Sequence, residues 1–437
     1  MHLNLMRLFL FIGISLLLSA CSVQQRIGRS AERLVLKDSS LTSAHVGISV
    51  FDTKTNRYLY NHQGEKYFVP ASNTKIPTCY AAMKYLGDSL VGLRYFETDT
   101  LIYINPTGDP TLLHRDFQHQ PVYRFLKESK KRIAYVRSGW ESKLYGSGWT
   151  WNDYGETYMV ERNELPIYGN FIEFQLKKEG GKTSLKGDIP FFRYALNELV
   201  DSVTEAITIT RRRTNNIYDV TASPALFRSA QIPFLTFENQ RLLEDTLKKA
   251  WLTNVHPPLG FNYKKLRSHA TDSMLKPLMH RSDNFFAEQT LLMVSNEVLG
   301  VMNEAKIIDT LLKSDFSDLP QKPRWADGSG LSRYNLFTPQ SFVAILNKMR
   351  TEFGMDRIKE IFATGGEGTI SSYYKADSSF IYAKTGTLSG VVALSGFLYT
   401  GKGKLLLFSV LVNNHQASST AVRKAVEKFV QGLRRNY

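Results

Sequence analysis

The first pattern along the chain is an alternation of apolar and polar residues. It runs through residues 45–63 on both sides of a Thr-Asn turn and predicts two β-strands. From Ser72 to Leu86 the apolar residues follow helical spacing instead, and Gly87 stands where helices often end in a left-handed residue. The chain therefore opens with two strands and one helix.

Two further changes of pattern divide the rest of the chain. From about residue 95 to 250, short β-like runs alternate with turns and aromatic-rich loops. Beyond Pro258 helical spacing returns in three segments, and three strands and a helix from about Ser418 to Leu433 close the sequence. We therefore expect an α+β fold whose sheet combines both ends of the chain, interrupted by an inserted β-rich module.

These changes of pattern define the expected segments. With 437 residues, 43% of them hydrophobic, the chain has enough apolar material for two or three domains. Whether the insert forms one subdomain or two stays open. The expected organisation is a signal segment at 1–20, a tether at 21–43, the α+β domain in two parts at 44–94 and 251–437, and the insert at 95–250.

The net charge of +15 would suit a nucleic acid, a membrane surface or an acidic polymer as partner. The N-terminus argues against nucleic acid. One arginine, an apolar run from Leu8 to Leu18 that is too short to span a bilayer, and small residues before Cys21 indicate a secretory signal. Residues 18–21, with the sequence LSAC, resemble a bacterial lipobox, which implies cleavage before Cys21 and a lipid on its sulfur.

We therefore expect a periplasmic lipoprotein that a lipid on Cys21 anchors to a membrane. Ser22 after the cysteine favours the outer membrane in the enterobacterial pattern. A plain signal peptide or an uncleaved anchor is the alternative. The other cysteine is Cys79, so acylation of Cys21 excludes an intramolecular disulfide, and Cys79 is expected to be a small buried apolar residue.

The first candidate for chemistry is the pair Ser72 and Lys75. They lie three residues apart on one face of the predicted helix, at its start, where a helix disfavours positive charge. A serine hydroxyl is a weak nucleophile until a base removes its proton, and a lysine with a lowered pKa can be that base. The pattern is weak by itself, because Ser273 and Lys276 repeat it.

A second candidate is the sequence Ser282-Asp283-Asn284 at the start of a helical stretch. The hydroxyl of Ser282 and the amide of Asn284 could face one cleft from the corner between a loop and a helix. The alternative is that Ser282 or Asp283 only caps this helix.

The third candidate is Lys384-Thr385-Gly386-Thr387 inside a strand pattern. A glycine in a strand often marks a place where another group approaches the backbone closely. A cation and two hydroxyls beside that place would suit a substrate carboxylate. The alternative is an edge strand with a bulge.

Together the three motifs occur in the order known for class A β-lactamases and penicillin-binding proteins. The separation between Lys75 and Ser282 is longer than a β-lactamase allows. The stretches PTGDPTL, GWTWNDYGETYMV, SDNFFAEQTL and DGSGLSRYN are similar to the low-molecular-weight penicillin-binding protein 4 family, the S13 D-alanyl-D-alanine carboxypeptidase/endopeptidases. The resemblance runs from about Ala44 to the C-terminus. It implies a serine β-lactamase/transpeptidase-like domain, with an antiparallel sheet flanked by helices and an all-helical region.

The resemblance also implies roles for the candidate residues. Ser72 would attack the carbonyl between two D-alanines and become acylated, with Lys75 as its base. Ser282 would relay a proton to the leaving amine, and Asn284 would hold Lys75 and the substrate amide. The implied substrates are peptidoglycan stem peptides, and β-lactams would acylate the same serine.

The strand motif would bind the end of the substrate. Lys384 would keep the site positive, lower the pKa of Lys75 and attract the terminal carboxylate, which Thr385 and Thr387 would hydrogen-bond beside Gly386. The backbone N–H groups of Ser72 and Thr387 would form an oxyanion hole, worth about 3 kcal/mol per donor.

Other functions are weighed against this one. We expect no cofactor and no metal site, since the sequence has no H-E-x-x-H and no close pair of histidines. No E-x-x-L-N stretch supplies a deacylating glutamate, so the turnover of penicillin is expected to be slow. The alternatives are an S-x-x-K esterase or β-lactamase-like hydrolase on the same fold, and a non-catalytic scaffold that binds peptidoglycan. The oligomeric state stays open.

Overall fold

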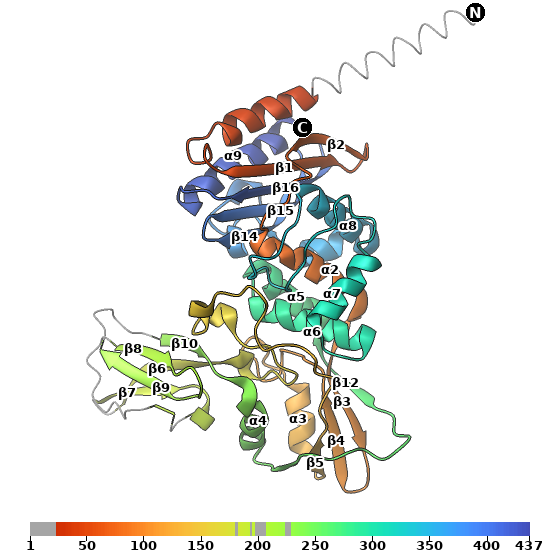
Figure 1. Cartoon of the computed structure of the whole chain (residues 1–437), viewed down its shortest axis with the longest axis vertical. Coiled ribbons are helices and arrows are strands. Elements are labelled where there is room, and N and C mark those ends of the chain that lie inside the picture. Colours follow the sequence, from red (N-terminus) through yellow and green to blue (C-terminus); the bar gives the residue numbers. More distant parts are fainter. Residues whose placement is uncertain (1–22, 180–181, 193–194, 197–206, 223–228) are drawn as a thin grey trace, which may run out of the picture.

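The computed structural model describes residues 23–437 apart from 180–181, 193–194, 197–206 and 223–228 (Figure 1). The expected signal segment at 1–20 and Cys21 lie outside the described residues. Among the helices described, none combines the length and the apolar character needed to cross a membrane.

The main sheet has six antiparallel strands in the order β13-β14-β15-β16-β1-β2. The first strand pairs with the last along its whole length, from His45 opposite Asn413 to Asp52 opposite Leu406. Strands from both ends of the sequence thus form one sheet, and the prediction of an α+β fold is confirmed. The strands are β1 (His45–Asp52), β2 (Arg57–His62), β13 (Ala363–Thr364), β14 (Ile381–Leu388), β15 (Val391–Tyr399) and β16 (Leu405–Asn413).

Helices cover both faces of this sheet, which is why β15 and β16 are buried along almost their whole length. One face packs on the C-terminal helix α9 (Ser419–Asn436), and the other packs on the central helices. The predicted helical stretch after residue 270 is broken at residues 281–283, and α8 is interrupted at Gly354. The central helices are α2 (Lys75–Tyr85), α5 (Thr271–His280), α6 (Asn284–Leu299), α7 (Glu304–Lys313) and α8 (Pro339–Ile361).

The expected tether at 21–43 is wrong for residues 23–36. Residues 23–31 are α-helical and continue into a π-helical turn, Glu32–Leu36. Ile27, Ala31 and Val35 are fully buried and belong to the same apolar cluster as α9. Their spacing of four residues is a helical stripe, which the dense arginines around it obscured in the sequence.

The inserted module contains a five-stranded sheet in the order β11-β5-β4-β3-β12. Along the chain, the first strand of this sheet is β3 (Ser89–Glu97) and the last is β12 (Lys264–Ala270), which pairs with β3. The sheet therefore begins before residue 95 and ends after residue 250. A three-stranded sheet and a two-stranded pair complete the module, and the three share one apolar core. Its other elements are β4 (Leu101–Pro106), α3 (Pro121–Glu128), β5 (Arg132–Tyr135), β6 (Phe171–Glu179), β7 (Lys182–Gly187), β8 (Ile207–Arg211), β9 (Tyr218–Ala222), β10 (Ser229–Pro233), α4 (Asn239–Leu247) and β11 (Trp251–Leu252).

The N-terminal helix should contribute to stability. In the protein lacking residues 1–21, Ile27→Ala should lower the free energy of unfolding by about 2–5 kcal/mol, because a buried side chain is lost and a cavity remains. Urea unfolding measures this loss. Gln25 is exposed on the same helix, so Gln25→Ala should change the value by no more than about 0.5 kcal/mol. Equal stabilities of the two variants would show that this segment is a loose tether after all.

Candidate active site

Ser72 and Lys75 lie where the chain passes from a short 3-10 turn, η2 (Ala71–Thr74), into α2. The α-helix therefore starts at Lys75, whereas we expected it to start at about Ser72. The contact between the two side chains survives this difference, since residues three apart in a 3-10 turn lie above one another. The Nζ atom of Lys75 is 3.1 Å from the Oγ atom of Ser72, and Lys75 is completely buried.

The buried ammonium of Lys75 has two further acceptors. It donates to Oδ1 of Asn284, the first residue of α6, at 2.6 Å, and to the backbone carbonyl of Ser329 at 2.7 Å. The three acceptors come from three separate parts of the chain. The structure thus brings Ser72, Lys75 and Asn284 together, as the motifs required.

Asn284 is itself oriented by the insert. Its Nδ2 atom donates to the carbonyl of Tyr158 at 2.8 Å, which leaves Oδ1 as the atom that faces Lys75. The amide therefore bridges the insert and the base.

Ser282 lies between α5 and α6 with a left-handed backbone, φ 64°. Asp283 caps α6 by accepting a hydrogen bond from the Phe286 N–H at 3.0 Å, so the capping alternative is correct for Asp283. Within the described residues, no hydrogen bond joins Ser282 to Ser72 or Lys75. Ser282 instead lines a cavity of about 410 Å³, together with Asn284 and residues of the insert.

The residues of the third motif lie on β14, which pairs without a break with β15. The alternative of an edge strand with a bulge is therefore wrong about the bulge and correct about the edge, since β13 pairs only with Tyr382 and Ala383 and leaves the other side of the motif without a strand among the described residues. A Cβ atom added at Gly386 would lie 2.5 Å from the carbonyl oxygen of Pro70 and 3.0 Å from the backbone nitrogen of Ser72. The group that approaches this glycine is thus the turn that carries the serine.

Lys384 is completely buried and donates to the carbonyl of Thr385 at 2.9 Å. Burial, and then the charge of Lys75, hold the pKa of Lys384 well below its usual range. Burial lowers the pKa of Lys75 only to about 8, because the carboxylates of Glu288, Asp327 and Asp283 oppose the loss of its proton.

The causes of these shifts add to one expectation. We expected the charge of Lys384 to lower the pKa of Lys75, and burial is the first cause of the lowered pKa of both amines. Lys75 faces three carboxylates, whereas Lys384 faces the ammonium of Lys75. Burial therefore disfavours the charged form of both amines, and nearby carboxylates oppose this effect at Lys75.

Each of the two threonines of the motif has a hydrogen-bond partner outside the strand. Thr385 donates to the hydroxyl of Thr369 at 2.7 Å, and Thr387 accepts a hydrogen bond from Nη2 of Arg423 at 2.6 Å. Arg423 comes from α9 and is a cation beside the expected carboxylate position. Sequence reasoning missed Arg423, because nothing in its local pattern separates it from other basic residues of an amphipathic helix.

The loop at residues 327–335 also forms part of the site, and the sequence predicted no role for it. Gly330 adopts a left-handed conformation, φ 84°, and a Cβ atom there would lie 1.9 Å from the carbonyl oxygen of Ala71. The loop therefore packs directly against the turn of Ser72. Its sequence, DGSGLSRYN, contributed to the family resemblance, but the role of Ser329 depends on a backbone carbonyl, which every residue has.

Nearly the whole chain is similar in sequence to known proteins. Residues 31–436 match the D-Ala-D-Ala carboxypeptidase 3 (S13) family. The D-alanyl-D-alanine carboxypeptidase DacB of Haemophilus influenzae is 24% identical over an alignment of 450 positions, which covers 90% of this chain and 90% of that protein. A D-alanyl-D-alanine carboxypeptidase of an Actinomadura species is 25% identical and covers 90% of this chain and 82% of its own length.

The fold has a counterpart among solved structures. Penicillin binding protein 4 (dacB) from Haemophilus influenzae has a TM-score of 0.71 at 21% identity, covering 93% of this chain and 98% of its own. At that identity the likeness concerns the fold, which includes the insert as well as the six-stranded sheet.

Proposed function

The chain belongs to the D-Ala-D-Ala carboxypeptidase 3 (S13) family, and we propose that it cleaves peptidoglycan peptides next to D-alanine through an acyl ester on Ser72. Membership of this family makes the chain a serine-type hydrolase. The observation that supports Ser72 as nucleophile is the buried Lys75 amine, 3.1 Å from its hydroxyl. This geometry disfavours the scaffold alternative, since a scaffold has no need for a buried amine at an unreacting serine.

In the proposed reaction, the neutral amine of Lys75 takes the proton of Ser72 while Oγ attacks the carbonyl carbon. The new O–C bond forms, the C–N bond breaks, and the proton passes to the leaving amine, with Ser282 at the cavity as relay. Water then adds to the ester and restores the Ser72 hydroxyl. Asn284 and Ser329 offer only acceptor oxygens to Lys75, so they stabilise its protonated form as the transition state is reached.

The strand motif supports binding of a carboxylate. Lys384 and Thr387 lie on β14, and Arg423 of α9 donates to Thr387, so two basic side chains and a hydroxyl gather along this strand. A carboxylate beside Lys384 favours the protonated form of its amine, so substrate binding and protonation of Lys384 support each other. An esterase on the same fold would not need this device, which favours a substrate with a free terminal carboxylate.

Digestion of purified muropeptides tests the proposed function. The protein lacking residues 1–21 should release terminal D-alanine or open cross-linked dimers, and chromatography of the products separates these two activities. Ser72→Ala should abolish both, and Lys75→Ala should lower them by about 10²–10⁴-fold, the usual range for a general base. No change in any muropeptide would support the scaffold alternative instead.

The pKa of Lys75 predicts the pH dependence of acylation. The rate at which a fluorescent penicillin acylates Ser72 should rise with pH, because only the neutral amine accepts a proton. The midpoint should lie near pH 8, where burial places the pKa of Lys75. Lys75→Arg is the matched control, since its guanidinium keeps the positive charge and does not release a proton. A similar rise in this variant would remove Lys75 from the role of base.

We propose further that the protein is a lipoprotein of the periplasm, anchored through Cys21. The support is the sequence of the first 21 residues and the lipobox-like LSAC at 18–21. Only Ser22 separates Cys21 from the described helix at 23–31, so an anchor on Cys21 would hold the folded domain close to the membrane surface. Figure 1 shows this helix near one end of the molecule and the five-stranded sheet at the other, so the insert would point away from the membrane.

A substitution of the cysteine tests the anchor. Cys21→Ser should move the full-length protein from the membrane fraction to the soluble fraction, and mass spectrometry should find a diacylglyceryl group on Cys21 only in the wild type. A Cys21→Ser protein that stays in the membrane fraction would indicate an uncleaved anchor. A wild-type protein cleaved elsewhere and free of lipid would indicate a plain signal peptide.

A further inference from the structure

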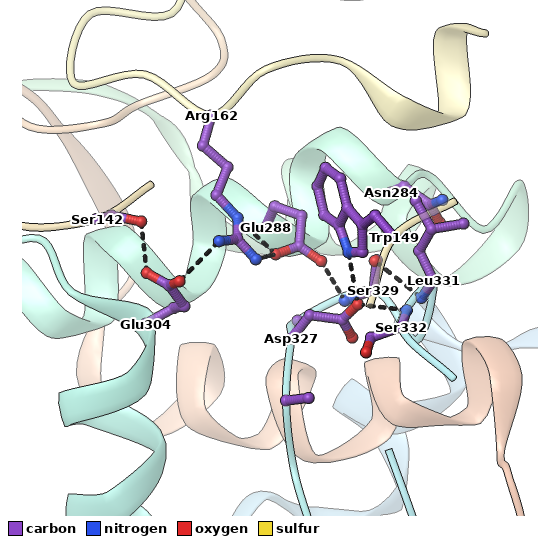
Figure 2. A network of polar contacts seen from close by, with 12 residues as sticks. Ser142, Trp149, Arg162, Asn284, Glu288, Glu304, Asp327, Ser329, Leu331 and Ser332 are labelled. Atoms are coloured by element: carbon purple, nitrogen blue, oxygen red, sulfur yellow. Dashed lines mark hydrogen bonds and ion pairs between the residues drawn. The ribbon is translucent and has the colours of Figure 1, made fainter. Parts of the chain in front are cut away.

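The carbonyl of Ser329, which accepts a hydrogen bond from Lys75, lies in a loop where two successive backbone N–H groups donate to buried carboxylates (Figure 2). The Ser329 N–H donates to Oε1 of Glu288 at 2.7 Å, and the Gly330 N–H donates to Oδ1 of Asp327 at 2.8 Å. Glu288 lies one helical turn beyond Asn284 on α6. Helix α6 thus supplies Asn284, which accepts directly from Lys75, and Glu288, which holds the loop that carries the acceptor Ser329.

Each of these carboxylates is bound by a side chain of the insert. Arg162 donates to Oε2 of Glu288 through Nε at 3.0 Å and through Nη2 at 2.6 Å. The indole N–H of Trp149 donates to Oδ2 of Asp327 at 2.9 Å, and the Arg162 guanidinium lies 5.0 Å from the centre of the Trp149 ring. Figure 2 shows Arg162 reaching Glu288, and Trp149 reaching Asp327 in the loop of Ser329.

Arg162 has a second carboxylate partner, away from the loop. Its Nη1 atom donates to Glu304 of α7 at 2.8 Å, and Glu304 also accepts from Ser142. No contact of Glu304 with the Ser329 loop occurs among the described residues. Glu288 and Glu304 therefore share the same arginine, but only Glu288 continues toward Lys75.

The energy of this network points to a role in positioning. Arg162 is 1% exposed, and taking a charge out of water costs several kcal/mol per ion even when it is paired. A buried ion pair is for that reason often no more stabilising than apolar residues of the same volume. What the pairing does supply is a fixed orientation, because the planar guanidinium holds one oxygen of Glu288 and leaves the other to the Ser329 N–H.

We propose that Arg162 and Glu288 are positioning residues for Lys75. The insert fixes Glu288 through Arg162, Glu288 fixes the N–H of Ser329, and the carbonyl of the same residue fixes the amine beside Ser72. This proposal rests on the proposed function of Lys75 as base, and it assigns to the insert a part in the chemical step as well as any part in binding the substrate.

The two glutamates that share Arg162 provide a matched test in the protein lacking residues 1–21. Glu288→Gln should lower the acylation rate constant at saturating fluorescent penicillin by about 10- to 100-fold, the cost of a slightly misplaced catalytic group. Glu304→Gln should change this rate constant by less than about twofold. Both variants should lower the thermal midpoint, since each removes one of the two carboxylates that pair with the same buried arginine.

The pH profile separates positioning from a general loss of stability. The groups that face Lys75 are Glu288 from α6, Asp283 at the N-cap of α6, Asp327 from the loop and Lys384 from β14. Because Glu288→Gln removes one of the carboxylates that oppose proton loss, the midpoint of the acylation profile should move below that of the wild type. Glu304→Gln should leave the midpoint in place.

A conservative substitution tests the arginine. Arg162→Lys, which keeps the charge, should acylate faster than Arg162→Met, and thermal melting shows whether each is folded. If Arg162→Met does not fold, the pair of glutamate variants decides. Equal rate constants for Glu288→Gln and Glu304→Gln, or a loss confined to penicillin affinity, would overturn the proposal. Acylation of the wild type on Ser72 tests the proposed function separately, because the present proposal concerns only the ratios between variants.

Discussion

The site depends on how a fully buried ammonium group is satisfied. A charge in the interior is tolerated only when acceptors surround it, and Lys75 finds three, on the turn of Ser72, on α6 and on the loop of Ser329. Those acceptors lie far apart along the chain. The fold that unites both ends of the sequence in one sheet, and packs the central helices against it, is what brings them to one point.

The same constraint explains the electrostatics. Burial lowers the pKa of both lysines, but only Lys75 faces carboxylates. Against this effect of burial, the carboxylates around Lys75 favour the protonated form of its amine, whose pKa is about 8. The difference arises from neighbours on α6 and the 327–335 loop, and not from the motifs that contain the two lysines.

Much of this could be predicted from the sequence, and the rest could not for identifiable reasons. Alternation and helical spacing predicted β1, β2, α2 and the closing strands, and the spacing of Ser72 and Lys75 predicted their contact. Ser329 acts through its backbone, so no residue type identifies it. Arg162 and Arg423 are two among many basic residues, and only tertiary packing buries the first and places the second at β14. The stripe of Ile27, Ala31 and Val35 was present in the sequence but was hidden among charges.

The insert therefore helps to position Lys75 in the catalytic domain. Two of the three acceptors of Lys75 are oriented from it, Asn284 by the carbonyl of Tyr158 and Ser329 through Arg162 and Glu288. Without these contacts, the amide of Asn284 could turn its donor toward Lys75. The N–H of Ser329 would also lose the acceptor that Arg162 holds in place. The catalytic domain carries every reacting group, yet its base is fixed in place by a module inserted between its two halves. A chain built in this way couples the folding of the insert to the reactivity of the serine.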